Sequence, residues 1–131
     1  MQDNKLIAEF MGYHYVAETK ITHDYFIVKG RYIRPNGIKF DTDWNWLMDV
    51  VDKIESLGAT TRVKSNYNQF IKANVHQVTI EIEKGELSEG NKVFWGDGFI
   101  YQNHSNSNVR KIEAYYESVV NFIKWYEQNN N

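Results

Sequence analysis

Two aspartates stand one residue apart, Asp41 and Asp43, in the stretch IKFDTDWNW. Together with Asn45 they reproduce the opening spacing of a calcium-binding loop. The turn glycine of such a loop is replaced here by Trp46, so we assign no calcium site. An Asp-x-Asp pair that follows a strand also occurs where one carboxylate attacks phosphorus and the other handles the proton. A metal-dependent hydrolase that uses these aspartates with His104 is therefore one hypothesis.

A second polar group, NHSNSN, precedes the last helical pattern of the chain. Amides, hydroxyls and an imidazole that converge on a helix N-terminus suit an anion. We predict a solvated loop here, whose side chains cap the helix. The functional alternative is a phosphate or nucleotide contact by His104, Ser105 and Ser107.

Aromatic and basic residues supply further candidates for a ligand site. Trp95 begins the flexible acidic stretch WGDG, where it either stacks on a base or packs at a hairpin tip. Arg31 and Arg34 flank Tyr32, as in sheets that hold nucleotides by phosphate contact and stacking. Strand alternation separates Arg31 from Arg34, which favours a solvated hairpin instead. The candidate ligand-binding residues are thus Arg31, Arg34, Trp95, His104, Ser105 and Ser107.

Helical periodicity predicts the elements that position these groups. Apolar residues recur at helical spacing within DNKLIAEFMG, WNWLMDVVDKIESLG and NVRKIEAYYESVVNFIKWYEQ. The apolar arc of the central helix covers about 200°, which is wide enough to contact both a sheet and another helix. We therefore expect a short N-terminal helix, a central helix and a long C-terminal helix.

Runs of β-branched and aromatic residues predict strands between the helices. They are YHYVAETKI, DYFIVKGRYI, GIKF, TTRVKSNY, ANVHQVTIEIEKG and KVFWGDGFIYQ. RPNG is the expected hairpin turn between the second and third. In the fifth, Val78 and Ile80 alternate with Thr79 and Glu81, which predicts one buried and one wet face. The fold class is α+β: an antiparallel sheet of about five to six strands with the three helices packed on one face.

Composition limits the classes of protein that remain. The 131 residues, 42% of them hydrophobic, suit one domain, 1–131, whose polar tail frays from about residue 127. Cysteine is absent, which excludes disulfides and thiolate metal sites. No stretch is apolar enough for a membrane span, so we expect a cytoplasmic protein with no membrane partner. The net charge of −2 gives no overall attraction to nucleic acid, and binding of that kind requires a local patch.

The segments NKLIAEFMG, WNWLMDVVDKIESLG and RKIEAYYESVVNFIKWYEQ resemble a group of small uncharacterised phage and prophage proteins of Bacteroidetes-type bacteria. The shared motifs are a Trp-x-Trp-Leu-Met helix and a terminal Phe-Ile-x-Trp-Tyr. The resemblance covers the three helices, about a third of the chain. It implies a phage-type accessory protein made inside a bacterial cell, and it assigns no catalytic residue because no activity is established for the group.

Our leading hypothesis is a non-enzymatic binding module that engages a host protein, and we also consider a homodimer. It rests on the missing catalytic motifs and on aromatic residues that suit an interface, namely Trp95, Tyr101 and Trp125. The alternative is a binder of small, phosphate-containing ligands. We assign no catalytic residue, cofactor or metal ligand, and we expect no nucleic-acid partner.

Overall fold

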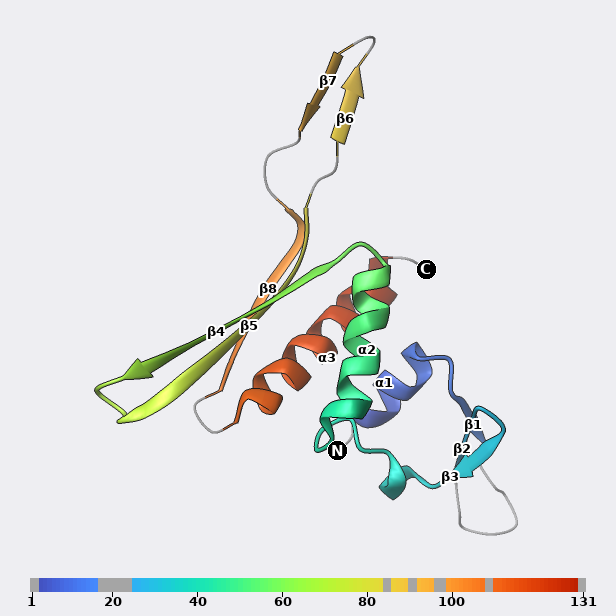
Figure 1. Ribbon diagram of the computed structural model, residues 1–131. Coiled ribbons are helices and arrows are strands. Elements are labelled where there is room, and N and C mark those ends of the chain that lie inside the picture. Colours follow the sequence, from blue (N-terminus) through green and yellow to red (C-terminus); the bar gives the residue numbers. More distant parts are fainter. Residues whose placement is uncertain are drawn as a thin grey trace.

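The computed structural model describes residues 3–16, 25–83, 86–89, 92–95, 99–107 and 110–129 (Figure 1). The helices are α1 (Asp3–Phe10), α2 (Trp44–Ser56) and α3 (Lys111–Asn129), with a short 3-10 helix η1 (Pro35–Gly37). The strands are β1 (His14–Val16), β2 (Tyr25–Val28), β3 (Arg31–Ile33), β4 (Thr60–Asn68), β5 (Ala73–Glu83), β6 (Glu86–Glu89), β7 (Lys92–Trp95) and β8 (Phe99–Ser107). The α+β class and the three predicted helices are confirmed.

The described strands form three separate antiparallel sheets, so the prediction of one sheet with five to six strands is wrong. Their orders are β1-β2-β3, β4-β5-β8 and β6-β7. The chain leaves the first sheet at Pro35, which has no backbone N–H to continue a ladder. RPNG therefore forms η1, with Gly37 N donating to Arg34 O at 2.8 Å, and is not a hairpin turn. The hairpin turn lies earlier, at Lys29 and Gly30, whose φ angles are 50° and 80°.

The three helices cover one face of the β4-β5-β8 sheet (Figure 1). α3 lies against β5 and β8, α2 lies against α3 and β4, and α1 lies against α3. Asp43 caps α2 by accepting a hydrogen bond from the Asn45 backbone N at 2.9 Å. On the two flanks of this helix, Trp44 contacts Tyr115 of α3 and Trp46 contacts Phe40. Both flanks of the wide apolar arc of α2 thus pack against neighbouring aromatic rings.

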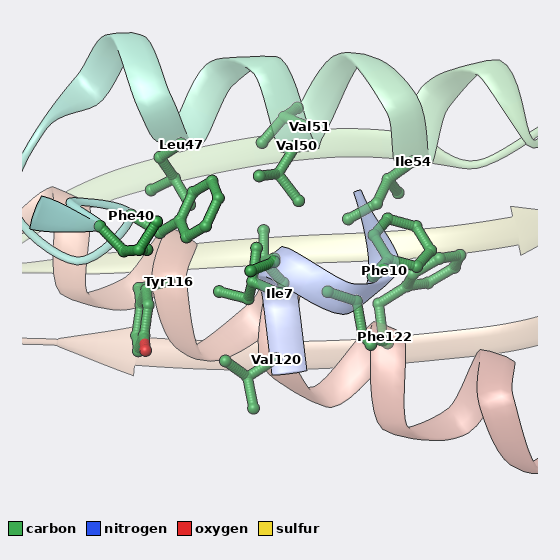
Figure 2. Close-up of a cluster of buried hydrophobic side chains, with 14 of the residues drawn as sticks. Ile7, Phe10, Phe40, Leu47, Val50, Val51, Ile54, Tyr116, Val120 and Phe122 are labelled. Carbon is green, nitrogen blue, oxygen red and sulfur yellow. The ribbon is translucent and has the colours of Figure 1, made fainter. Parts of the chain in front are cut away.

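The hydrophobic core fills the space between the helices and the sheet (Figure 2). Its fully buried members are contributed by all three helices, by β2, by the segment before α2 and by β5; they include Ile7, Phe26, Phe40, Leu47, Val50, Ile54, Ile80, Val119 and Phe122. A core with side chains from so many segments fixes the positions of α1, α2 and α3 relative to the sheet.

One buried asparagine connects α1, the entry to α2, and α3. Asn4 is 7% exposed, and its Nδ2 donates to Asp41 Oδ1 at 3.0 Å and to Ile38 O at 3.3 Å. Tyr116 Oη donates to Asn4 Oδ1 at 2.9 Å. Burial, together with the nearby charges of Asp3 and Asp41, raises the pKa of Tyr116 above its ordinary value. The network therefore keeps Tyr116 as a neutral hydrogen-bond donor.

Candidate functional site

Residues 103–107 of the stretch NHSNSN are part of strand β8, so the prediction of a loop is wrong for them. It pairs with β5 as far as Ser107 opposite His76. The ladder hydrogen bonds of this pairing outweigh the low strand propensity of asparagine and serine. Because successive residues of a strand point to opposite faces, His104 lies on the face away from Ser105 and Ser107. The structure therefore divides the predicted phosphate-binding group.

His104 lies on the outer face of the β4-β5-β8 sheet, the face away from the helices. Its Nδ1 is 2.6 Å from Thr79 Oγ1. Beside this pair, Glu81 accepts from Gln102 Nε2 at 2.9 Å and forms an ion pair with Arg62 at 2.9 Å. Thr79 and Glu81 are only 6% and 5% exposed, so the prediction of a wet face is wrong here. Neighbouring side chains on β4 and β8 cover the central strand and satisfy its polar groups.

Ser105 lies under α3 and has no access to a ligand. It is 3% exposed. Asn121 Nδ2 of α3 donates hydrogen bonds to Ser105 Oγ at 3.5 Å and to Asn103 Oδ1 at 3.3 Å. These contacts attach β8 to α3, which is a structural role.

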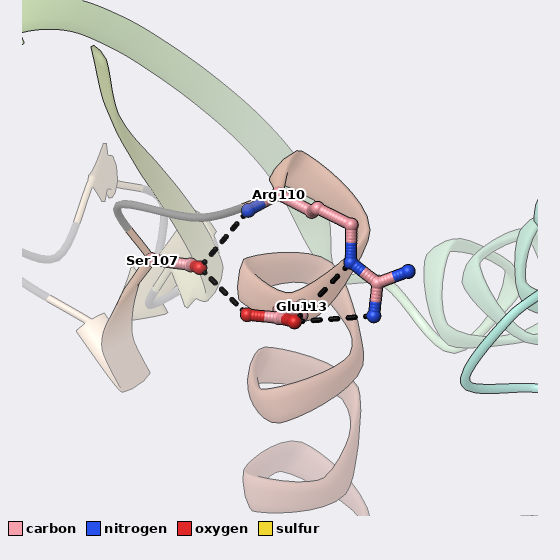
Figure 3. Close-up of polar contacts among 3 residues, drawn as sticks. All are labelled: Ser107, Arg110 and Glu113. Carbon is pink, nitrogen blue, oxygen red and sulfur yellow. Dashed lines mark hydrogen bonds and ion pairs between the residues drawn. The ribbon is translucent and has the colours of Figure 1, made fainter. Parts of the chain in front are cut away.

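Ser107 belongs to the N-terminal cap of α3 (Figure 3). Its Oγ donates to Glu113 Oε2 at 3.0 Å and accepts from the Arg110 backbone N at 3.4 Å. The Arg110 guanidinium binds the other oxygen of Glu113 at 3.1 Å. Ser107 thus has the capping role that the sequence favoured, and the chain's own carboxylate occupies the position that the alternative interpretation gave to a phosphate.

Arg31 lines a cavity of about 470 Å³ between the first sheet and α2. Tyr13, Lys29, Trp46 and Asp49 line the same cavity. Burial and the neighbouring Asp49 carboxylate raise the pKa of Tyr13 above its ordinary value. Two cations and two aromatic rings are therefore brought together at this cavity.

Arg34 is exposed at the start of η1 and is not among the residues that line the cavity. Trp95 ends β7 opposite Glu86, in the pair farthest from the connection between the two strands. The side chain of Trp95 and residues 96–98 of WGDG lie outside the described part of the chain. Arg34 therefore does not join Arg31 at the cavity.

Tyr101 and Trp125, two of the predicted interface residues, contact each other. Their ring centroids are 4.7 Å apart, and both rings also contact Phe122. Burial raises the pKa of Tyr101 to about 12. Both side chains thus pack α3 onto edge strand β8, and an interface role for them stays a prediction.

The aspartates of DTD and His104 are on different sides of the molecule. Asp41 accepts from Asn4 and Asp43 caps α2, on the side of the sheet that carries the helices. His104 is on the outer face. Within the residues that the structure describes, no three His, Asp or Glu side chains are grouped to hold a metal ion. The geometry does not assemble the hydrolase constellation.

The β4–β5 hairpin continues beyond the rest of its sheet as a projecting arm, residues 66–75 (Figure 1). β8 pairs with β5 only as far as His76, whereas β4 and β5 pair onward to Asn68 opposite Ala73. The arm is therefore a two-stranded ribbon, and in the described part of the chain no helix covers it. Tyr67, Phe70 and Ile71 are 62%, 98% and 47% exposed. Exposed apolar groups that cluster in this way mark interaction sites.

The tip of the arm is held in one conformation by Asn68. Its Oδ1 accepts hydrogen bonds from the backbone N of Phe70 at 2.9 Å and of Ile71 at 3.3 Å. Lys72, which leads the chain into β5, has a φ of 55°, a left-handed conformation that glycine or asparagine adopts at lower cost. An ordered tip loses less conformational entropy on binding than a disordered one.

None of the functional residues predicted from the sequence lies in the arm. The flanking strands are predicted correctly, but Phe70 receives no function there. A signal existed in NYNQFIK, where two aromatic residues stand among amides at a turn. The exposure of the tip depends on where β8 and α3 end, and the local pattern of β4 and β5 carries no information on that.

Comparisons with family models, with curated proteins and with solved structures find no match to this chain. Among the described helices, none is long and apolar enough to cross a lipid bilayer. The arm and the cavity beside Arg31 are therefore the two candidate functional sites of the described chain.

Proposed function

We propose that this chain is a non-enzymatic binding protein of phage type that engages another macromolecule through the tip of the arm. The observation that carries the proposal is the exposure of Phe70, which is 98% accessible on an ordered turn. A partner that buries a phenylalanine side chain gains about 1.5–3 kcal/mol of hydrophobic free energy. The tip is thus the place where a contact stabilises a complex most.

Two further observations support this proposal. Tyr67 and Ile71 extend the apolar surface on either side of Phe70, and aromatic side chains are frequent energetic centres of interfaces. The polar groups of β8, by contrast, bind the chain's own side chains, as Ser107 binds Glu113. The resemblance of the helices to phage and prophage proteins favours a partner inside a bacterial cell.

Affinity capture from bacterial lysate tests the proposal. We would immobilise the wild-type chain, a Tyr67→Ser/Phe70→Ser variant and a Tyr32→Ser control, and identify retained proteins and nucleic acids. Tyr32 is a suitable control because it is 75% exposed but lies on the other three-stranded sheet. We expect the arm variant to lose a partner that the wild type and the control retain. Equal retention by all three chains contradicts the proposal.

A second candidate function is the binding of a small anionic aromatic ligand, such as a nucleotide, beside Arg31. The cavity of about 470 Å³ has a size that suits such ligands, and Lys29 and Trp46 accompany Arg31 there. Asp49 opposes an anion, so the ligand has to place its charge near the two cations. A thermal-shift screen with nucleotides tests this function, because ligand binding stabilises the folded state. A stabilisation that Arg31→Ala abolishes supports it, and no shift with any nucleotide rejects it.

A further inference from the structure

The arm and its base carry an excess of positive charge within an acidic chain. From Thr60 to Ile80 the sequence contains Arg62, Lys64 and Lys72 but no aspartate or glutamate, although the whole chain has a net charge of −2. Arg62 is paired with Glu81. Lys64 and Lys72 are exposed, and neither takes part in an ion pair among the described residues. This is a local patch whose charge complements an anionic partner.

The dimensions of the arm match a groove of duplex DNA. Three residue pairs lie beyond His76, and the turn 69–72 follows them. At about 3.3 Å per residue these pairs extend for about 10 Å. The major groove of B-DNA is about 12 Å wide and about 8.5 Å deep, and it admits a two-stranded β-ribbon. The arm is therefore long enough for Phe70 at its tip to reach the floor of such a groove.

The distribution of side chains over the two faces favours a duplex over a single strand. Strand alternation places Tyr67 on one face of the ribbon and Lys64 on the other. A platform for single-stranded nucleic acid combines aromatic rings and cations along one surface. A ribbon inserted into a groove of duplex DNA instead has a wall of the groove on each side, so side chains on both faces of the ribbon contact the DNA. Asn66 and Asn74, also on opposite faces, offer amides to either wall.

We propose that the arm binds double-stranded DNA by entering its major groove, with Lys64 and Lys72 on phosphates and Phe70 on base edges. An apolar ring in this position contacts the methyl group of thymine, and asparagine side chains form paired hydrogen bonds with adenine. This inference rests on the proposed function, because it names the macromolecule that the arm engages. It also replaces the expectation of no nucleic-acid partner, which follows from net charge alone.

Fluorescence anisotropy with a short labelled DNA duplex of mixed sequence tests the inference. Two phosphate contacts predict that the association constant falls about tenfold between about 50 mM and 200 mM salt. The same strand without its complement is the comparison, and we expect the duplex to bind more tightly. Absence of duplex binding at low salt, or tighter binding of the single strand, overturns the inference.

Single substitutions assign the contacts. Lys64→Ala and Lys72→Ala should each reduce the salt-dependent loss from about tenfold to about threefold, since each removes about one phosphate contact. Phe70→Ala should weaken binding by about tenfold to a hundredfold without changing the salt dependence, because it removes an apolar contact. Lys124→Ala on α3 is the matched control for charge, and it should bind DNA like the wild type. Equal affinity in all four variants contradicts an arm-mediated contact.

Nuclease treatment separates failure of this inference from failure of the proposed function. In the lysate capture, DNA retained by the wild type should disappear after DNase and should be absent from the Tyr67→Ser/Phe70→Ser variant. If an arm-dependent protein partner remains after DNase and the duplex does not bind, the arm is a binding surface but its partner is a protein. If the arm variant retains everything that the wild type retains, both proposals fail.

Discussion

The two ends of the β4–β5 hairpin show how one pair of strands serves as core and as free surface. At the covered end, Val78 and Ile80 are fully buried, and Ser118 of α3 donates to Val78 O at 3.0 Å. At the free end, Tyr67 and Phe70 are 62% and 98% exposed. Apolar and aromatic residues occur at both ends. Their burial is decided by how far β8 and α3 extend along the hairpin.

This difference separates stability from binding within a single element. We call the three helices with the covered part of the β4-β5-β8 sheet the frame. Buried apolar surface stabilises the fold in proportion to its area, so the frame should carry the free energy of folding and the arm very little. Matched substitutions, one in each region, test this division.

The largest difference is expected for phenylalanine. Phe122 is fully buried in α3, and Phe122→Ala should lower the free energy of unfolding by about 3–5 kcal/mol through lost contacts and a cavity. Phe70→Ala should leave it unchanged, because the ring is already in water. Urea denaturation of both variants measures the contrast. A clear loss of stability in Phe70→Ala would mean that the tip is buried in solution, for instance in a homodimer.

Tyrosine provides the second pair. Tyr116→Phe removes the donor to Asn4 and leaves a buried amide oxygen without its partner, which should cost about 1–3 kcal/mol. Tyr67→Phe in the arm removes an exposed hydroxyl and should have no measurable effect on stability. The same denaturation experiment compares them. Equal stability of the two variants would show that the Asn4 network contributes nothing to the frame.

Serine provides the third and weaker pair. Ser118 is fully buried and donates to Val78 O, so Ser118→Ala should cost about 1 kcal/mol. Ser65 forms an exposed hydrogen bond with His76 at 2.8 Å at the base of the arm, and Ser65→Ala should cost less. Thermal melting of the two variants gives the order. The reverse order would place more stability in the base of the arm than the frame hypothesis allows.

The smallest effect at neutral pH concerns Tyr101, whose buried hydroxyl has no hydrogen-bond partner among the described residues. Tyr101→Phe should therefore be neutral or slightly stabilising at pH 7. Burial raises the pKa of Tyr101 from its ordinary value of 10.0 to about 12 in the folded state, so above pH 10 the unfolded chain ionises first. Stability should fall as the pH rises from 10 to 12.

The Tyr101→Phe variant should lose less stability than the wild type over that interval. Melting temperatures of both chains, measured in parallel across this pH range, report the difference, and the shared titration of lysines cancels between them. An identical alkaline decline in both chains would exclude a folded-state shift of the Tyr101 pKa.

The sequence predicts the helices and most strands because their apolar spacing is local. In the structure Asp43 caps α2 and Gly58, with a φ of 101°, follows its end, and both are local features of the chain. Sheet membership is different, because it depends on which strands meet. β3 is only three residues long and ends before η1, so it does not pair with β4. The alternation of apolar and polar residues within a strand does not reveal this.

The candidate site was harder to predict for the same physical reason. Ser107 and His104 are close in sequence but lie on opposite faces of strand β8. The amino-acid sequence of this stretch, rich in asparagine and serine, favours a loop. Glu113 takes the position of the expected anion, which depends on the geometry of a cap rather than on a motif. Arg31 reaches a cavity with Trp46, a contact between distant segments.

The end of β8 at Ser107 has a consequence for evolution and for engineering. Residues 66–75 extend past the last strand pair that joins the hairpin to the core, so a change in their sequence or length leaves the core contacts intact. A new binding specificity can therefore arise there without compensating mutations elsewhere. The same property makes the turn 69–72 a site for grafting a foreign peptide onto this scaffold.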